Sequence, residues 1–210
     1  MTEHILETRD LEFNNVLSYG NLKIPRGKAT FLVGESGRGK STLLKLFNAS
    51  LSPSRGELYY EGQKLEELDT IALRKEVLLI SQNVFLFDTT IRENFRSFYE
   101  YREWELPSAD RMEEFLRLCC LRLPLDRDCT TMSGGERQRV YMAIYLSFAP
   151  KVLMLDEPTS ALDSRNGHDV LANILSYCRE HAITPVVVSH DQELTREFAE
   201  NIIQVGRRDK

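Results

Sequence analysis

The most informative segment of the sequence is Thr30-Phe31-Leu32-Val33-Gly34-Glu35-Ser36-Gly37-Arg38-Gly39-Lys40-Ser41-Thr42. An apolar run opens it, the spacing G-x-x-x-x-G-K-[ST] follows at residues 34–41, and apolar residues at helical spacing come next, at 43, 44, 46 and 47. A glycine-rich loop between a strand and a helix can point successive backbone N–H groups at phosphate oxygens, and the helix N-terminus adds partial positive charge. The stretch therefore predicts a strand, a phosphate-binding loop and a helix.

Each residue type in this loop suits a nucleotide phosphate chain. Lys40 would reach the β- and γ-phosphates, and the hydroxyl of Ser41 would ligate Mg²⁺. Arg38 has two interpretations, because it could lie beside the phosphates or face solvent. The residues expected to bind the nucleotide here are Gly34, Glu35, Ser36, Gly37, Arg38, Gly39, Lys40, Ser41 and Thr42.

Three more apolar runs, at residues 77–80, 152–155 and 186–188, each lead to polar residues. Runs that are apolar on both faces are typical of parallel strands covered by helices. Their alternation with helical patterns predicts an α/β fold with a mainly parallel sheet. In such sheets ligands bind beyond the carboxyl ends of the strands, which here carry Gln82, Asp156, Glu157 and His190. We therefore expect these side chains to belong to one site.

Two carboxylates follow the run at 152–155. Asp156, at a buried strand end, could hold Mg²⁺ through water, and Glu157 could deprotonate an attacking water. The alternative is a solvated acidic pair opening a turn, which Pro158 would favour. The phosphate loop favours the catalytic interpretation.

A second helix N-terminus is predicted at Ser133-Gly134-Gly135-Glu136. Ser133 and Glu136 have the spacing of a capping box. A capping box does not require two glycines, whereas exposed N–H groups at glycines can approach an anion closely. This helix end could therefore bind a phosphate, and a second copy of the chain could bring it to the nucleotide.

The remaining segments complete one domain over residues 1–210. Shorter amphipathic strands within 1–30 and 55–65 predict an antiparallel layer beside the main sheet, and the charged, aromatic stretch at 91–128 predicts a helical subdomain at about 88–145, inserted in the α/β core. A length of 210 residues suits one domain of roughly 100–200 residues, or one with a small subdomain. The aromatic run from Phe95 to Trp104 would form that subdomain's own core or line a docking groove.

Composition excludes several classes of protein. Hydrophobic residues make up 42% and charged residues 28%, which argues against extensive disorder. The net charge of −5 is unfavourable for broad binding of nucleic acid, and we expect no nucleic-acid partner. No apolar run approaches the roughly 20 residues of a membrane helix, and four cysteines without C-x-x-C spacing are typical of a cytosolic protein.

On these motifs the chain resembles the nucleotide-binding subunit of an ABC transporter, over about residues 5–205. The resemblance implies a P-loop NTPase core, with residues 34–41 as the Walker A loop and 132–136 as the signature, which reads Met-Ser-Gly-Gly-Glu where the family usually has Leu-Ser-Gly-Gly-Gln. It implies ATP and Mg²⁺ as cofactors, with Ser41, Gln82 and Asp156 at the metal. It assigns catalysis of ATP hydrolysis to Glu157, His190, Gln82 and Lys40. It adds Ser133, Gly134, Gly135 and Asp163, the last in the D-loop, to the nucleotide-binding residues.

The resemblance also implies two partners. One is a second copy of the chain, paired head to tail in an ATP-sandwich dimer, and the other is an integral membrane permease. The chain opens with Met1 and ends soon after its last predicted strand, so we expect a separate subunit, peripheral on the cytoplasmic face of the cell membrane. Residues 86–94 resemble the segment after the Q-loop in exporter-type ATPases, although the exporter phrase Thr-Glu-Val-Gly-Glu is absent before the signature. The compact length and this mixture resemble small bacterial subunits that pair with a separate metal- or ion-exporting permease, which favours export of a metal or small ion.

Three points stay open. A soluble ABC-type ATPase acting on nucleic acid or ribosomes is the alternative function, although the coiled-coil insertions or basic extensions usual there are missing from the sequence. A kinase or GTPase would explain the phosphate loop but not the signature. Phe13 and Tyr19 are both candidates for stacking on adenine, a position where the family often has an aromatic residue.

Overall fold

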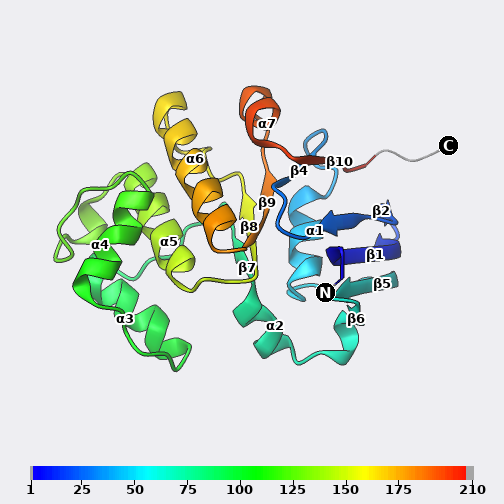
Figure 1. Ribbon diagram of the computed structural model, residues 1–210, viewed down its shortest axis with the longest axis horizontal. Coiled ribbons are helices and arrows are strands. Elements are labelled where there is room, and N and C mark those ends of the chain that lie inside the picture. Colours follow the sequence, from blue (N-terminus) through cyan, green and yellow to red (C-terminus); the bar gives the residue numbers. More distant parts are fainter. Residues whose placement is uncertain (1, 207–210) are drawn as a thin grey trace. The chain divides into compact units, whose positions relative to one another are not determined.

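The computed structural model describes residues 2–206, and these form two compact units (Figure 1). The first unit comprises Pro150–Glu157 together with the described parts of Met1–Leu79 and Tyr177–Lys210. The second comprises Ile80–Ala149 and Pro158–Ser176. The helical subdomain predicted at about 88–145 falls within the first segment of the second unit.

The parallel sheet has the strand order β10-β4-β9-β8-β7, and the pairs β10–β4, β4–β9 and β9–β8 are parallel. All four apolar runs of the sequence become strands of this sheet, so the prediction of a mainly parallel α/β fold is confirmed. The two strands β8 and β9 are buried along their whole length, as expected for strands apolar on both faces. The strands are β4 (Thr30–Val33), β7 (Val77–Ile80), β8 (Val152–Asp156), β9 (Thr184–Val188) and β10 (Asn201–Gln204).

The predicted antiparallel layer is also confirmed. Its order is β2-β1-β5-β6, with β3 paired to β1. The first strand is longer than the sequence indicated, because register shifts interrupt its alternation of buried and exposed residues. The strands are β1 (His4–Phe13), β2 (Leu17–Gly20), β3 (Lys23–Pro25), β5 (Arg55–Tyr60) and β6 (Gln63–Lys64).

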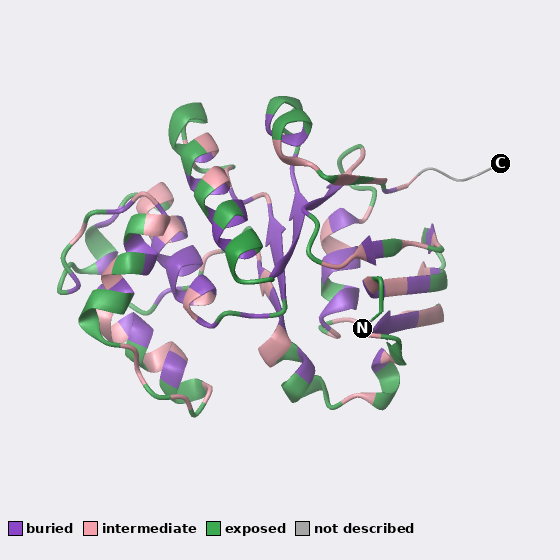
Figure 2. Ribbon diagram, viewed as in Figure 1, coloured by how far each residue is buried: buried purple, intermediate pink, exposed green. Residues whose placement is uncertain are grey.

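Helix α1 (Lys40–Phe47) lies between the two sheets of the first unit (Figure 1). Its apolar residues Leu43, Leu44, Leu46 and Phe47 are fully buried in one core cluster with residues of both sheets. Figure 2, which is coloured by burial, shows most of this helix in purple, the colour of buried residues. Burying an aliphatic or aromatic side chain of this size contributes about 1.5–3 kcal/mol, so α1 is fixed mainly by packing. The first unit also contains α2 (Thr70–Glu76), the short helix η1 (Leu65–Glu67) and α7 (Gln192–Phe198).

The second unit is mainly helical. Hydroxyl side chains of Thr90, Ser108 and Ser133 cap the N-termini of α3 (Ile91–Tyr101), α4 (Ala109–Leu118) and α5 (Gly134–Ser147). The short helix η2 (Cys129–Thr131) precedes α5, and α6 (Ser164–Glu180) contributes its residues up to 176. In the aromatic run, Phe95 and Tyr99 are buried, which supports the interpretation of the run as the subdomain's own core.

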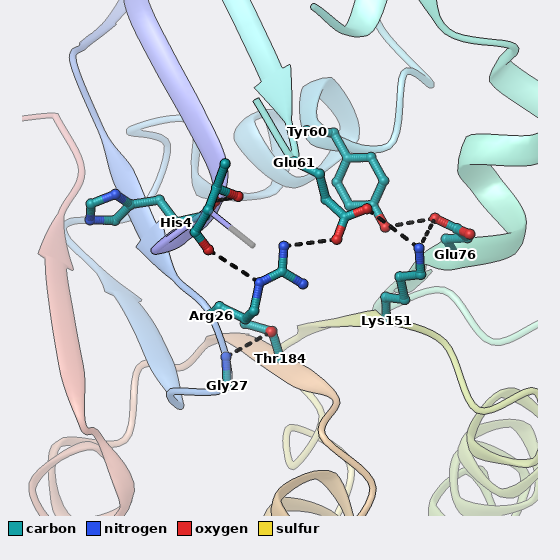
Figure 3. Close-up of polar contacts among 9 residues, drawn as sticks. His4, Arg26, Gly27, Tyr60, Glu61, Glu76, Lys151 and Thr184 are labelled. Atoms are coloured by element: carbon teal, nitrogen blue, oxygen red, sulfur yellow. Dashed lines mark hydrogen bonds and ion pairs between the residues drawn. The ribbon is translucent and has the colours of Figure 1, made fainter. Parts of the chain in front are cut away.

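A chain of polar contacts connects the antiparallel sheet to α2 and to the start of β8 (Figure 3). Arg26 pairs with Glu61 at 2.7 Å, and Lys151 lies 3.4 Å from Glu61 and 3.1 Å from Glu76. The hydroxyl of Tyr60 donates to Glu76 at 2.7 Å. Burial raises the pKa of this hydroxyl, so it remains a donor at neutral pH. The network therefore connects the turn after β5, the last residue of α2 and the residue before β8.

Gly56, in β5, lies close to the backbone of β1. It has φ +82°, and a Cβ there would lie 2.3 Å from the carbonyl oxygen of Asp10 and 2.5 Å from that of Arg9. The register of the two strands shifts at this point, which is typical of a β-bulge. Gly27 has a similar φ of +70° but no atom within 4 Å of its would-be Cβ.

We therefore predict that Gly56→Ala destabilises the protein more than Gly27→Ala. Left-handed strain alone should cost about 1–2 kcal/mol in Gly27→Ala. Added overpacking should bring Gly56→Ala to about 3–5 kcal/mol. Urea unfolding of the two variants and the wild type measures both losses, and equal losses would contradict the close approach at Gly56.

Candidate functional site

The phosphate loop connects β4 to α1 through glycines in conformations that other residues rarely adopt. Gly37 has φ +75°, and Gly39, which precedes the first helical residue, has φ +85°. No side chain caps the N-terminus of α1. The first N–H groups of a helix have no intrahelical acceptor, so a phosphate would satisfy them.

Lys40 is buried, and its side chain extends back toward the first residues of the phosphate loop. It is 6% exposed, and its ammonium donates to the carbonyl oxygens of Gly34 and Glu35 at 2.8 and 3.0 Å. The ammonium therefore lies at the first residues of the loop, although Lys40 itself opens the helix. Arg38 is exposed instead and forms an ion pair with Glu35 at 2.7 Å, which corresponds to the solvent-facing interpretation of this residue.

Ser41 and Asp156 are brought together by the fold. The hydroxyl of Ser41, in the first turn of α1, donates to Asp156 at the end of β8 over 3.0 Å. Burial raises the pKa of the Asp156 carboxyl, and the hydrogen bond from Ser41 opposes that shift. A hydroxyl and a carboxylate are hard oxygen ligands of the type that Mg²⁺ prefers, and Mg²⁺ usually keeps several waters beside one or two protein ligands. The pair fits a magnesium ion.

Glu157 and His190 form the second pair at this sheet edge. The His190 Nε2 atom lies 3.0 Å from Oε1 of Glu157. Glu157 has φ +53°, and its N–H donates to the carbonyl of Val188, which fixes the turn after β8. The strand ends thus place a carboxylate, an imidazole, a lysine and a serine–aspartate pair in the first unit, whereas Gln82, which was expected with them, belongs to the second.

The other predicted site residues lie in the second unit. The capping box is confirmed, because the Ser133 hydroxyl accepts from the Glu136 N–H and the Glu136 carboxylate accepts from the Ser133 N–H. Asp163 caps α6 through the N–H of Asn166 at 3.0 Å, and hydrogen bonds from Asn166 lower the pKa of its carboxyl. Gln82 lies in the segment after β7 and is exposed.

The two glycines of the signature have different surroundings. A Cβ on Gly135 would lie 2.9 Å from the carbonyl oxygen of Ala161, so packing alone requires glycine there. Gly134 has no atom within 4 Å of such a Cβ, so packing does not explain it. The open surroundings of Gly134 leave room for a ligand to approach its backbone closely.

Both candidates for stacking on adenine are at least partly buried. Phe13 packs against the core cluster of the first unit. Tyr19 is only 8% exposed, and its hydroxyl donates to the carbonyl of Gly39 at 2.8 Å. This contact with the phosphate loop could not be predicted, because no sequence spacing connects β2 to Gly39.

A parallel sheet with a glycine-rich loop, a lysine and a serine–aspartate pair at its carboxyl edge defines a nucleoside-triphosphate-binding protein. Comparison with known proteins names the family. The model of the ABC transporter family matches residues 17–160, and the chain belongs to that family.

Individual relatives cover most of the chain. It is 34% identical to a phosphonates import ATP-binding protein, PhnC, of Wolinella succinogenes, over 87% of this chain and 71% of the relative. It is 35% identical to a probable iron export ATP-binding protein, FetA, of Escherichia coli, over 85% of this chain and 79% of the relative. Among solved structures, a dimeric post-hydrolysis state of the cassette MJ0796 with ADP and Pi matches at a TM-score of 0.82 and 27% identity, covering 98% of this chain and 97% of that one.

The protein is therefore an ABC-type ATP hydrolase that energises transport, and its partners are a membrane permease and a second copy of the chain, as the family resemblance implied. Within residues 2–206, the structure contains no helix that is both long and apolar enough to cross a membrane.

We predict that Glu157→Gln retains ATP binding and lowers turnover by ~10²–10⁴-fold, because an amide cannot accept a proton from water. Titration with ATP and a phosphate-release assay measure the two quantities. Glu193→Gln, which changes an exposed carboxylate in the first turn of α7, is the matched control. Wild-type turnover in Glu157→Gln would contradict the general-base assignment.

Proposed function

We propose that the protein hydrolyses Mg-ATP at its phosphate loop to energise export of a metal or small ion through a separate permease, on the cytoplasmic face of the membrane. The proposal that the protein hydrolyses ATP rests on the arrangement of side chains at the carboxyl ends of the parallel strands. There Lys40 crosses the phosphate loop, Ser41 meets Asp156, and Glu157 meets His190.

The metal part of the proposal rests on Ser41 and Asp156. These two residues would hold Mg²⁺, with Gln82 as the third predicted ligand. A bound Mg²⁺ supplies charge neutralisation on the β- and γ-phosphate oxygens. The buried position of Asp156 suits this role, since a carboxylate in a low dielectric interacts strongly with a cation.

The remaining residues of the first unit would position the reaction. Lys40 and the N–H groups at the start of α1 would bind the phosphates through the residues at 34–42. Glu157 would take a proton from the attacking water, and His190 would orient the Glu157 carboxylate and hold the γ-phosphate. Catalysis of this kind derives from positioning and charge stabilisation rather than from covalent chemistry.

A second copy of the chain would complete the site. Its Ser133, Gly134 and Gly135 would present the N-terminus of α5 to the nucleotide, with Asp163 nearby. The open surroundings of Gly134 support this assignment. The result would be an ATP-sandwich dimer.

The proposed direction and cargo of transport rest on two observations. Residues 86–94 resemble exporter-type ATPases, and one relative at 35% identity is a probable iron export protein. A relative at 34% identity serves phosphonate import. The experiment therefore has to measure direction.

Producing Glu157→Gln in the native host in place of the wild type tests the transport proposal. Tagged protein purified from detergent-solubilised membranes with Mg-ATP should bring down a multi-span membrane protein. Cellular metal and ion content, measured by elemental analysis, should rise for the exported species, and Glu193→Gln should leave it unchanged. A fall in one species would indicate import, and recovery of ribosomes or nucleic acid would favour the soluble alternative.

The permease contact is proposed at Phe85 and Phe87 in the second unit. Their side chains are 58% and 44% exposed, with ring centroids 5.0 Å apart. Phe87 also meets Phe98 edge-on at 6.1 Å, so the exposed pair is anchored to the unit's aromatic core. Exposed apolar side chains grouped in this way mark interaction sites.

We predict that the double substitution Phe85→Ser and Phe87→Ser lowers permease recovery by about tenfold or more, as expected for loss of two aromatic anchors. ATP hydrolysis by the isolated protein should stay within about twofold. Ile71→Ser removes an apolar side chain that is 68% exposed in α2, outside the predicted docking run, and is the control. Undiminished recovery of the permease by the double variant would exclude this contact.

A further inference from the structure

We infer that Tyr19 is a positioning residue of the phosphate loop, because its hydroxyl holds the carbonyl of the glycine from which α1 begins. The inference rests on the nucleotide binding proposed above. It assigns to Tyr19 a role in the binding of phosphates rather than in the recognition of the base.

The geometry around Gly39 carries the inference. The Tyr19 hydroxyl donates to the Gly39 carbonyl at 2.8 Å, and the same carbonyl accepts the N–H of Leu43 at 2.9 Å. The second of these bonds closes the first turn of α1. Tyr19 therefore acts on the peptide unit that orients the start of the helix.

The hairpin of β1 and β2 packs directly against this point of the loop. A Cβ on Gly39 would lie 2.5 Å from the Tyr19 hydroxyl oxygen and 2.6 Å from a methyl of Leu17. Gly39 is thus required twice, by its φ of +85° and by the approach of β2. The loop conformation depends on a strand that precedes it by some 20 residues.

The pKa of the hydroxyl is affected by burial and also from the helix side. Burial raises the pKa of Tyr19 to about 12, and the Thr42 side chain, in the first turn of α1, acts to lower it. The hydroxyl therefore keeps its proton, and its bond to Gly39, throughout the physiological pH range.

A ring in this position is poorly suited to stacking. Tyr19 is 8% exposed, since Leu17, the loop and the core cluster cover it. A stacking residue would need one whole ring face for the base. The hydroxyl, not the ring face, is the part of Tyr19 directed at the loop.

The test compares a nucleotide with a ligand that has no base. Calorimetric titration with ATP and with inorganic tripolyphosphate, both with Mg²⁺, is carried out on wild type, Tyr19→Phe and Tyr60→Phe. Tyr19→Phe should bind both ligands more weakly by the same factor, about two- to tenfold, the range of one neutral hydrogen bond. Tyr60→Phe removes a buried hydroxyl bonded to Glu76 instead, and should leave both affinities unchanged.

A second measurement separates positioning from general stability. Amide hydrogen exchange at residues 40–43 should quicken in Tyr19→Phe, while exchange in β8 and β9 stays at the wild-type rate. Unchanged tripolyphosphate affinity with unchanged exchange would overturn the role of Tyr19 alone. A wild type that binds neither ligand would overturn the nucleotide site itself, and with it this inference.

Discussion

Helix α1 is buried between two sheets, and the positions of the site residues follow from that burial. Of its eight residues only Lys45 is exposed, and the apolar ones are packed against strands of both sheets. A helix held on both sides has little freedom to shift, because interiors are close-packed. Its N-terminus is therefore a fixed point, and the phosphate loop, Ser41 and the Lys40 ammonium take their positions from it.

The parallel pairing of the strands places the carboxylate and imidazole side chains next to the phosphate loop. Since β8 and β9 run in the same direction as β4, their carboxyl ends meet the loop at one sheet edge. Asp156 ends β8, and Glu157 and His190 lie just after β8 and β9, so the sheet itself brings the three side chains together. Polar residues that follow separate apolar runs can therefore be expected at one sheet edge from the sequence alone.

The sequence predicts the strands that are buried continuously. It does not predict the strands that are short or half-exposed. The four apolar runs are recognisable because they are buried on both faces. Strand β10 escapes prediction since it alternates between partly buried and exposed residues, with Ile202 56% exposed. Contacts across space escape it too. Two examples are the hydrogen bond from Tyr19 to Gly39 and the close approach of Ala161 to Gly135. Both result from tertiary packing, which the spacing of residues within a motif does not report.

The glutamate of the signature shows how a structural role and a binding role compete at one helix end. Hydrogen bonds from the Ser133 N–H and then from its hydroxyl hold the pKa of Glu136 below its usual range, so the carboxylate stays ionised. A phosphate bound by the Ser133 hydroxyl must take that donor from Glu136, whereas the bond from the Ser133 N–H can persist. The N–H groups of residues 134 and 135 have no intrahelical acceptor and need no such exchange. Phosphate binding at this end would therefore rely first on the backbone of the two glycines, with the serine hydroxyl recruited by displacement of its own cap.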